Sequence, residues 1–160
     1  MDRVNRILNN NTYKTNLDSL KELEKNRTFC RHGLEHLLDV ARLSYIENLE
    51  KGLGIDKSII YATALLHDLG RVLEYKENLP HDKASVLLAK KILPECGFSE
   101  DDIKLICMAI GEHKNIKELE DKGLCGLIYR ADKKSRNCFS CNAIADCKWS
   151  KEKKNYTIES

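Results

Sequence analysis

The spacing of hydrophobic residues is helical along most of the chain. In the segment 31–50 they recur every three or four positions, as on one face of an α-helix, at Leu34, Leu37, Leu38, Ala41 and Tyr45. The segment 57–69 is hydrophobic nearly all round, which is typical of a helix in the middle of a bundle. The alternation of a β-strand is absent over any useful length. The pattern therefore predicts an all-α fold, a single helical bundle.

Residues that favour helix ends bracket these two helices. Gly52 and Gly54 are expected to end the first one, and the carboxylate of Asp56 to cap the second. Nearer the N-terminus, Asn16 is expected to cap a short helix over 17–23.

Three more helices are expected in the second half of the chain. The segment 81–93 is helical in pattern, and Pro94 is expected to stop it. Ser99 and Asp102 have the spacing of a capping box, with Asp in place of the usual Glu, and should open the next helix. The last core helix is expected over 124–135.

Length and composition fit one domain with a short appendage. The chain has 160 residues, of which 42% are hydrophobic and 32% charged, enough to bury a core without cross-links. We expect a helical domain over 1–135 and an irregular, cysteine-rich, basic tail over 136–160, where helical periodicity is lost. Neither the composition nor the pattern indicates an oligomeric state.

Charge and hydropathy narrow the expected partners and location. The net charge of +2 is too small to favour nucleic acid or a membrane surface as a partner. No run of about 18 apolar residues is long enough to span a bilayer, and the N-terminus has no signal-peptide core. A cytoplasmic protein is expected.

Two carboxylates interrupt the most hydrophobic helices. Asp68 follows His67 at the end of the segment 57–69, and Asp132 lies in the helix expected over 124–135. A buried carboxylate is costly unless a cation balances it. Imidazole and carboxylate together suit Fe, Mn, Zn, Co or Ni, whereas Mg and Ca prefer oxygen ligands alone. The sequence therefore predicts a centre for one or two divalent transition metals.

The order of these residues resembles the HD superfamily of metal-dependent phosphohydrolases. An H-x-x-x-V-A element begins at His36, the stretch LLHDLGR contains His67 and Asp68, and a Y-x-A-D element ends at Asp132. This resemblance, which covers most of the chain, implies a helical bundle of the HD-domain type. It also implies one metal held by these four residues.

Two further histidines extend the resemblance to the branch of the superfamily that has six ligands and two metals. His81 follows the HD dipeptide, and His113 ends a helix before Asp132. By resemblance the two histidines hold a second metal, with Asp68 bridging; the alternative is that they are surface residues near helix ends. Within this branch the chain looks most like the HD-type symmetrical dinucleoside tetraphosphate hydrolases.

The first ligand has two candidates, because His32 and His36 share one face of a helix. His36 is preferred because Val40 and Ala41 follow it in the register of the family. Arg31 and His32 are then expected at the rim of the cleft, where they could contact a phosphate; the alternative is a solvated helix start.

The resemblance implies hydrolysis of a nucleotide or another small phosphate ester or anhydride, with water activated at the metals that Asp68 holds. Arg71 and Lys133 are placed to hold phosphate oxygens in such a reaction, or are surface charges. Two other functions would use the same ligands. One is an HD-type di-iron oxygenase, which cleaves C–C or C–P bonds with dioxygen, and the other is a metal-binding sensor without turnover.

The chain has seven cysteines, many for a cytoplasmic protein. Three are expected to be buried in the core: Cys96, Cys107 and Cys125. The other four form a candidate second metal site of the zinc or iron–sulfur type, built on a C-x-x-C pair: Cys30, Cys138, Cys141 and Cys147. The alternative for these four is a set of free thiols in the tail.

Overall fold

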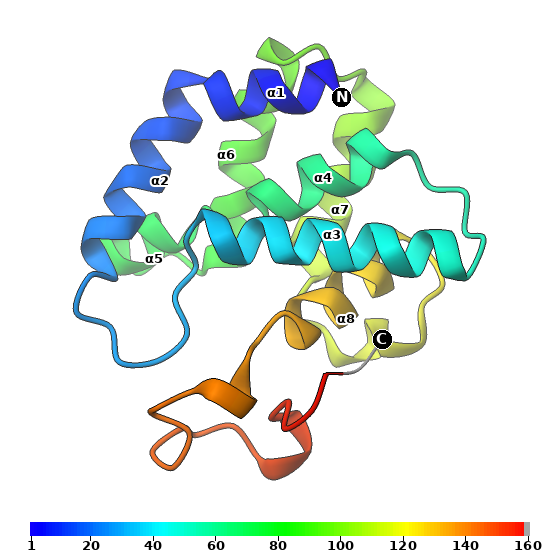
Figure 1. Ribbon diagram of the computed structural model, residues 1–160. Helices are drawn as coiled ribbons and strands as arrows, with labels where there is room; N and C mark the ends of the chain where they lie inside the picture. The colour runs from blue at the N-terminus through cyan, green and yellow to red at the C-terminus, as the bar shows by residue number, and fades with distance from the viewer. Residues whose placement is uncertain (159–160) are drawn as a thin grey trace.

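The computed structural model describes residues 1–158, and every regular element in this part is a helix (Figure 1). The all-α prediction is thereby confirmed. In chain order the elements are α1 (Asp2–Asn9), α2 (Asn11–Leu23), α3 (Leu34–Glu50), α4 (Lys57–Leu66), α5 (Arg71–Glu77), α6 (His81–Glu95), α7 (Glu100–Glu112), η1 (Ile116–Glu120), α8 (Leu124–Lys134), η2 (Cys138–Ser140) and η3 (Lys151–Lys153).

Helix α4 is the centre of the bundle, as its hydrophobic circumference predicts. Its core side chains, among them Ile60, Leu65 and Leu66, are fully buried against α3, α7, α8 and α1. Truncating one such leucine to alanine typically costs about 2–5 kcal/mol. This packing fixes the C-terminal end of α4 firmly in the interior, and with it the two residues that follow, His67 and Asp68.

Several expected helix ends are confirmed. The Asp56 carboxylate accepts hydrogen bonds from two backbone N–H groups in the first turn of α4. The capping box is complete, since the Ser99 hydroxyl accepts from the Asp102 N–H and the Asp102 carboxylate accepts from the Ser99 N–H. Gly52 and Gly54, with φ angles of 60° and 71°, carry the chain from α3 toward α4.

Two expected boundaries are wrong. The cap at the N-terminal side of α2 is Asn10, whose side chain accepts from the backbone N–H of Tyr13 at 3.1 Å, whereas Asn16 lies inside the helix. Pro94 does not stop α6, which ends at Glu95. A proline removes a single backbone donor, and in the last turn its cost is small enough for the helix to finish.

Five elements have no counterpart in the sequence prediction: α1, α5, η1, η2 and η3. The segment 57–69 was expected as one helix, yet α4 ends at Leu66, and the turn formed by residues 67–70 separates it from α5. This turn carries the HD dipeptide.

The tail, residues 136–158, has only the short helices η2 and η3 and lies at one end of the bundle below α8 (Figure 1). The loop between α2 and α3 reaches the same end. Cys96, Cys107 and Cys125 are buried in the bundle, as expected. Within residues 1–158, no helix combines the length and the apolar character that crossing a bilayer requires.

Candidate metal centre

Five imidazole rings surround the carboxylate of Asp68. Asp68 itself is 1% exposed, and all five histidines are buried. The Nε2 atom of each ring lies within 4 Å of an Asp68 oxygen: His67 at 3.4 Å, His36 and His81 at 3.5 Å, His113 at 3.7 Å and His32 at 3.9 Å. Every histidine of the chain therefore contributes to one buried centre.

A glycine allows the helices to approach this closely. A Cβ atom on Gly70 would lie closer than 3.0 Å to backbone atoms of His81 and Ser85, in the first turns of α6. The backbone N–H of Gly70 also donates to the Ser85 hydroxyl at 2.8 Å. Position 70, two residues after Asp68, must therefore be glycine for α6 to bring His81 beside Asp68.

The six predicted ligands form two groups that share Asp68. In each group the donor atoms lie within 4.8 Å of one another. The first group is His36, His67, Asp68 and Asp132, and the second is Asp68, His81 and His113. Of the two histidines considered for the first ligand, His36 belongs to the first group and His32 belongs to neither.

The outer nitrogen of each ligand histidine is held by the surrounding protein. The Nδ1 atoms of His67 and His113 lie 2.7 and 2.6 Å from the backbone carbonyls of Ala64 and Ile110. The Nδ1 atom of His81 lies 2.9 Å from a Glu74 oxygen. Because a carbonyl or carboxylate oxygen can only accept, Nδ1 is the donor in each ring, and Nε2 is the nitrogen turned to the centre, where a metal would bind it.

His36 is oriented by a serine. The Ser135 hydroxyl donates to the Asp132 carbonyl at 2.8 Å and lies 3.1 Å from the Nδ1 atom of His36. Since the hydroxyl has given its only proton to the carbonyl, it accepts from Nδ1. The Nε2 atom of His36 therefore faces the carboxylates of Asp68 and Asp132, at 3.5 and 3.4 Å.

The donor set fits a metal ion. Among the described residues, the Nε2 atoms of His67 and His81 are buried and have no hydrogen-bond partner. Leaving a buried polar atom without a partner costs about 1–3 kcal/mol. A divalent cation bound by these lone pairs and by the two carboxylates would remove this cost. Nitrogen and oxygen donors together suit a transition metal.

The electrostatics of the centre also call for positive charge. Burial opposes the ionisation of Asp68, yet the surrounding imidazoles hold its pKa well below the usual range. The pKa of Asp132 is likewise low, because the neighbouring His36, His67 and Lys133 outweigh the effect of its burial. The two carboxylates in turn overcome the effect of burial on His67 and raise its pKa to about 9.

Two of the cationic residues predicted to hold phosphate lie at the centre. Arg71 donates from Nε to Asp68 at 2.9 Å, and its side chain is 19% exposed, so that it spans from the centre to solvent. Lys133 forms an ion pair with Asp132 and lies over the ring of Tyr129. Both are therefore paired with carboxylates of the candidate metal centre and are not free surface charges.

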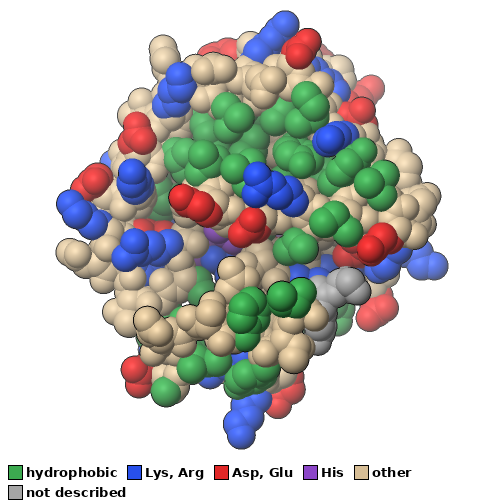
Figure 2. Space-filling model, in the orientation of Figure 1, with side chains coloured by type: hydrophobic (Ala, Val, Ile, Leu, Met, Phe, Trp, Pro, Cys, Tyr) green, Lys and Arg blue, Asp and Glu red, His purple; other side chains and the backbone are tan. Residues whose placement is uncertain are grey.

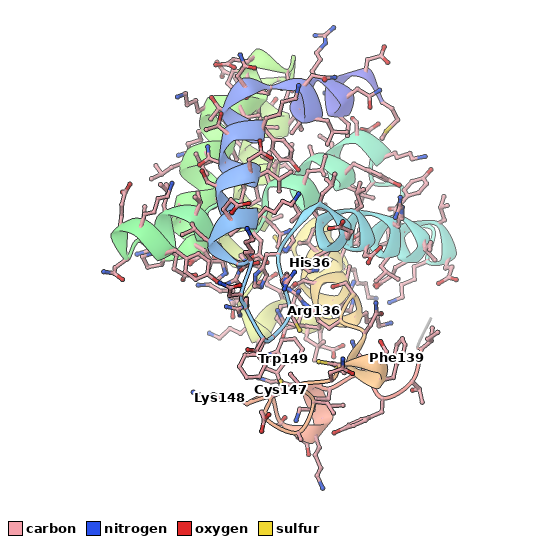
Figure 3. The ribbon with its side chains drawn as sticks, turned by 60° about the vertical axis from the view of Figure 1, so that its left-hand side comes forward. His36, Arg136, Phe139, Cys147, Lys148 and Trp149 are labelled. Carbon is pink, nitrogen blue, oxygen red and sulfur yellow. The ribbon has the colours of Figure 1, made fainter. Side chains whose placement is uncertain are left out.

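Arg136 is a site residue that the sequence analysis did not identify. Its side chain is 7% exposed, and its NH2 atom donates to Nε2 of His36 at 3.0 Å and to Asp132 at 3.3 Å (Figure 3). Its NH1 atom donates to the carbonyl of Arg31 at 3.1 Å. The only sequence signal was its position four residues after Asp132, one helical turn along.

The placement expected for His32 is wrong. Helix α3 begins at Leu34, so His32 lies in the loop before it and does not share a helical face with His36. His32 lies buried at 3% exposure, not at the rim, and its Nδ1 atom lies 2.5 Å from Oε1 of Glu24. Arg31, by contrast, is exposed and lines a cavity of about 300 Å³ that reaches His36 and Arg136. In Figure 2 a small area of histidine is visible in a recess between acidic and basic side chains.

The four remaining cysteines line a second cavity, of about 180 Å³: Cys30, Cys138, Cys141 and Cys147. Burial raises the pKa of Cys30, and the sulfurs of Cys138 and Cys141 raise it further, although Arg136 lowers it. Cys30 and the tail, far apart in the sequence, therefore meet in space.

Comparison with known proteins places the chain in a family. The HD domain family matches residues 33–137. An uncharacterized protein of Clostridium beijerinckii is 45% identical over 158 residues, 99% of each chain. Ribonuclease Y of Ureaplasma parvum is 35% identical over 88 residues, and that of Mycoplasma capricolum 31% identical over 101 residues. These stretches are 55% and 63% of this chain but only 16% and 18% of the ribonucleases. No solved structure gives a significant match.

Proposed function

Because the chain belongs to the HD domain family, we propose that it is a metal-dependent phosphohydrolase that acts on a nucleotide or another small phosphate ester or anhydride. The observation that carries the proposal is the position of Asp68. It belongs to two groups of metal donors and faces imidazole nitrogens that have no hydrogen-bond partner among the described residues.

In this proposal His36, His67, Asp68 and Asp132 hold one metal, and His81 and His113 hold a second one with Asp68 as the shared ligand. When bound, iron, manganese, zinc, cobalt or nickel lowers the pKa of water and stabilises charge on phosphoryl oxygens. Two metals would place the protein in the branch that includes the symmetrical dinucleoside tetraphosphate hydrolases.

The protein's own cations are suited to the substrate. The Nε2 atom of His36 has one lone pair, which Arg136 now uses, so a metal at that nitrogen would release the guanidinium group. Arg136 lines the 300 Å³ cavity together with Arg31, and an arginine fork matches two phosphate oxygens. We assign Arg136, Arg71 and Lys133 to phosphate binding, with Arg31 at the entrance.

The named relatives support phosphoester chemistry. A ribonuclease cleaves phosphodiester bonds, and the part of Ribonuclease Y that resembles this chain overlaps the matched HD residues. The net charge of +2 is small, and it does not by itself favour a long nucleic acid as the substrate. A small phosphorylated substrate is therefore proposed.

The test is turnover by the full chain, purified without oxygen and loaded in turn with each of the five metals. The substrate panel contains nucleotides, dinucleoside polyphosphates and simple phosphate esters. Release of phosphate or nucleotide without oxygen is expected. Turnover that requires oxygen uptake would contradict the proposal and favour a di-iron oxygenase. Bound metal with no turnover on any substrate would instead favour a sensor.

A pair of matched variants links the activity to the centre. Asp68→Asn is expected to lower both metal content and turnover by about 100-fold or more, since even outer residues of such sites contribute 10–100-fold. Asp101→Asn changes a 93% exposed carboxylate in the same way and should leave both unchanged. Full activity in the Asp68 variant would disprove the assignment.

A further inference from the structure

Four cysteines meet at the end of the bundle and take no part in the chemistry described above. We propose that Cys30, Cys138, Cys141 and Cys147 form a second, independent metal site, a four-thiolate site for a zinc ion or an iron–sulfur cluster. The two occupants share this ligand chemistry and are told apart by the experiment below. The proposal does not depend on the hydrolase function.

The first argument is convergence. Three of the thiols come from the tail, and the fourth comes from the loop between α2 and α3, yet all four line one cavity of about 180 Å³. All four are free thiols; Cys138 is buried and the others are half-buried. Four cysteines from two segments provide the complete ligand set of a tetrahedral site.

The local backbone is shaped for chelation. Helix η2 turns the chain between Cys138 and Cys141, and the N–H of Cys141 donates to the carbonyl of Cys138 at 3.1 Å. A second turn follows, in which the N–H of Ile144 donates to the carbonyl of Cys141 at 3.2 Å. Both cysteines of the C-x-x-C pair, which these turns connect, line the cavity.

Positively charged side chains surround the cavity. Arg27, Lys148 and Lys154 line it, and no carboxylate is among its described lining residues. Four thiolates around a divalent ion carry a net charge of about −2, which these cations would balance. Phe29 and Trp149 supply an apolar wall that limits access of water. Cys147 and Trp149 lie below Arg136 in Figure 3.

The tail also lacks another means of staying folded. Within residues 136–158, the buried hydrophobic side chains are Cys138 and Ala143, while Phe139, Tyr156 and Ile158 are 47%, 52% and 86% exposed. A segment with so little buried apolar area gains order from a metal cross-link, because binding at thiolates is coupled to folding. Bonds of about 2.3 Å would draw the sulfurs to about 3.8 Å from one another. Without a metal the four sulfurs are farther apart. Within residues 1–158, the groups whose donor atoms all lie within 4.8 Å of one another contain only histidine and aspartate.

The experiment uses the full chain, purified without oxygen. Zinc, iron and acid-labile sulfide are measured per chain, and alkylation followed by mass spectrometry counts the protected cysteines. We expect one zinc, or one cluster with iron and sulfide together, beyond the metal of the histidine–aspartate centre. Four cysteines should resist alkylation until acid or a chelator releases the metal.

Two site variants and two controls locate the metal. Cys30→Ala and Cys141→Ala should each lose at least ten-fold of this metal, whereas Cys107→Ala, a change of a core cysteine, should retain it. Asp68→Asn should lose metal from the histidine–aspartate centre alone. Circular dichroism shows whether each variant folds, and for the cysteine variants the metal content of the histidine–aspartate centre is a second check.

Three results would overturn the proposal. The first is an unchanged metal content in Cys141→Ala. The second is a loss of metal in Cys141→Ala without a loss in Cys30→Ala, which would remove Cys30 from the ligand set. The third is the detection by mass spectrometry of disulfides among these cysteines in freshly purified wild-type protein.

Discussion

The carboxylate of Glu24 holds the imidazole of His32 in place, with Oε1 2.5 Å from Nδ1. The same carboxylate accepts the backbone N–H of His32 at 2.6 Å and the hydroxyl of Tyr75 at 2.9 Å. The opposite nitrogen of the ring, Nε2, then lies 3.9 Å from Asp68. His32 is thus oriented in the same way as the proposed ligands, although it lies outside both donor groups.

Replacing Glu24 by Gln should therefore weaken the centre without emptying it. An amide oxygen lacks the charge that lets one carboxylate accept three short hydrogen bonds, so turnover is expected to fall by about 10–100-fold. Metal content in the four-residue group should stay at the wild-type level. Tyr75→Phe, which removes one of the three donors and keeps the anion, should have a much smaller effect. Equal turnover in Glu24→Gln and wild type would show that His32 needs no orientation.

Stability of the metal-free protein should decline in acid. Burial lowers the pKa of His32 to about 4, and hydrogen bonds from His32 and Tyr75 overcome burial and lower that of Glu24 to about 2. Below pH 6.5 the unfolded chain protonates its histidine before the folded protein does, and below pH 4.5 it protonates its glutamate first. The free energy of unfolding should therefore fall from about pH 6.5 toward pH 2. Denaturant melts at stepped pH measure it, and Glu24→Gln should flatten the part below pH 4.5.

Without metal, the free energy of unfolding should also fall as the pH rises above neutrality. The raised pKa of His67, about 9, stabilises the fold fully below pH 6.5, and this contribution is lost as pH rises through 9. A metal at Nε2 replaces the proton and should abolish this dependence. Melting with and without a chelator, between pH 6 and 10, makes the comparison. Parallel curves for the two forms would argue against a metal at His67.

Gly70 should not tolerate a side chain. Its Cβ would overlap backbone atoms of His81 and Ser85, which cannot move without displacing α6. Gly70→Ala is expected to destabilise the fold by about 3 kcal/mol, the upper end of the range for overpacking, and to lower metal content as His81 shifts. Gly111→Ala, whose Cβ would meet nothing closer than Val86 at 3.9 Å, should instead stabilise α7 by about 1 kcal/mol. Thermal melts of both variants test the contrast.

Arg136 should contribute to substrate binding. Arg136→Ala removes a guanidinium beside the four-residue donor group and is expected to lower kcat/KM by about 10- to 100-fold, the value of a hydrogen bond to a charged group. Most of this loss should appear in KM. Arg42→Ala, which removes an arginine that is 60% exposed and paired with Asp39, is the control and should change neither constant. A kcat/KM at the wild-type level would remove Arg136 from the site.

The sequence alone determined those features that depend on neighbours along the chain. The helical period, the cap at Asp56 and the capping box of Ser99 are local, because their interactions reach no farther than one helical turn. The order of His36, the HD dipeptide, His81, His113 and Asp132 was likewise readable, since each is placed at or near a helix end or on a helical face.

Tertiary structure decided which side chains meet these residues. Glu24 reaches His32 across a loop that has no periodicity, so nothing in its spacing indicated the contact. Arg136 begins a tail without a regular pattern, and only the packing of that tail against the bundle turns it inward to His36. The spacing of His32 and His36 predicted one shared helical face, yet His32 lies in the loop before α3, where it is buried against Glu24. Burial and long-range contacts arise from how helices pack, which periodicity along a single chain does not specify.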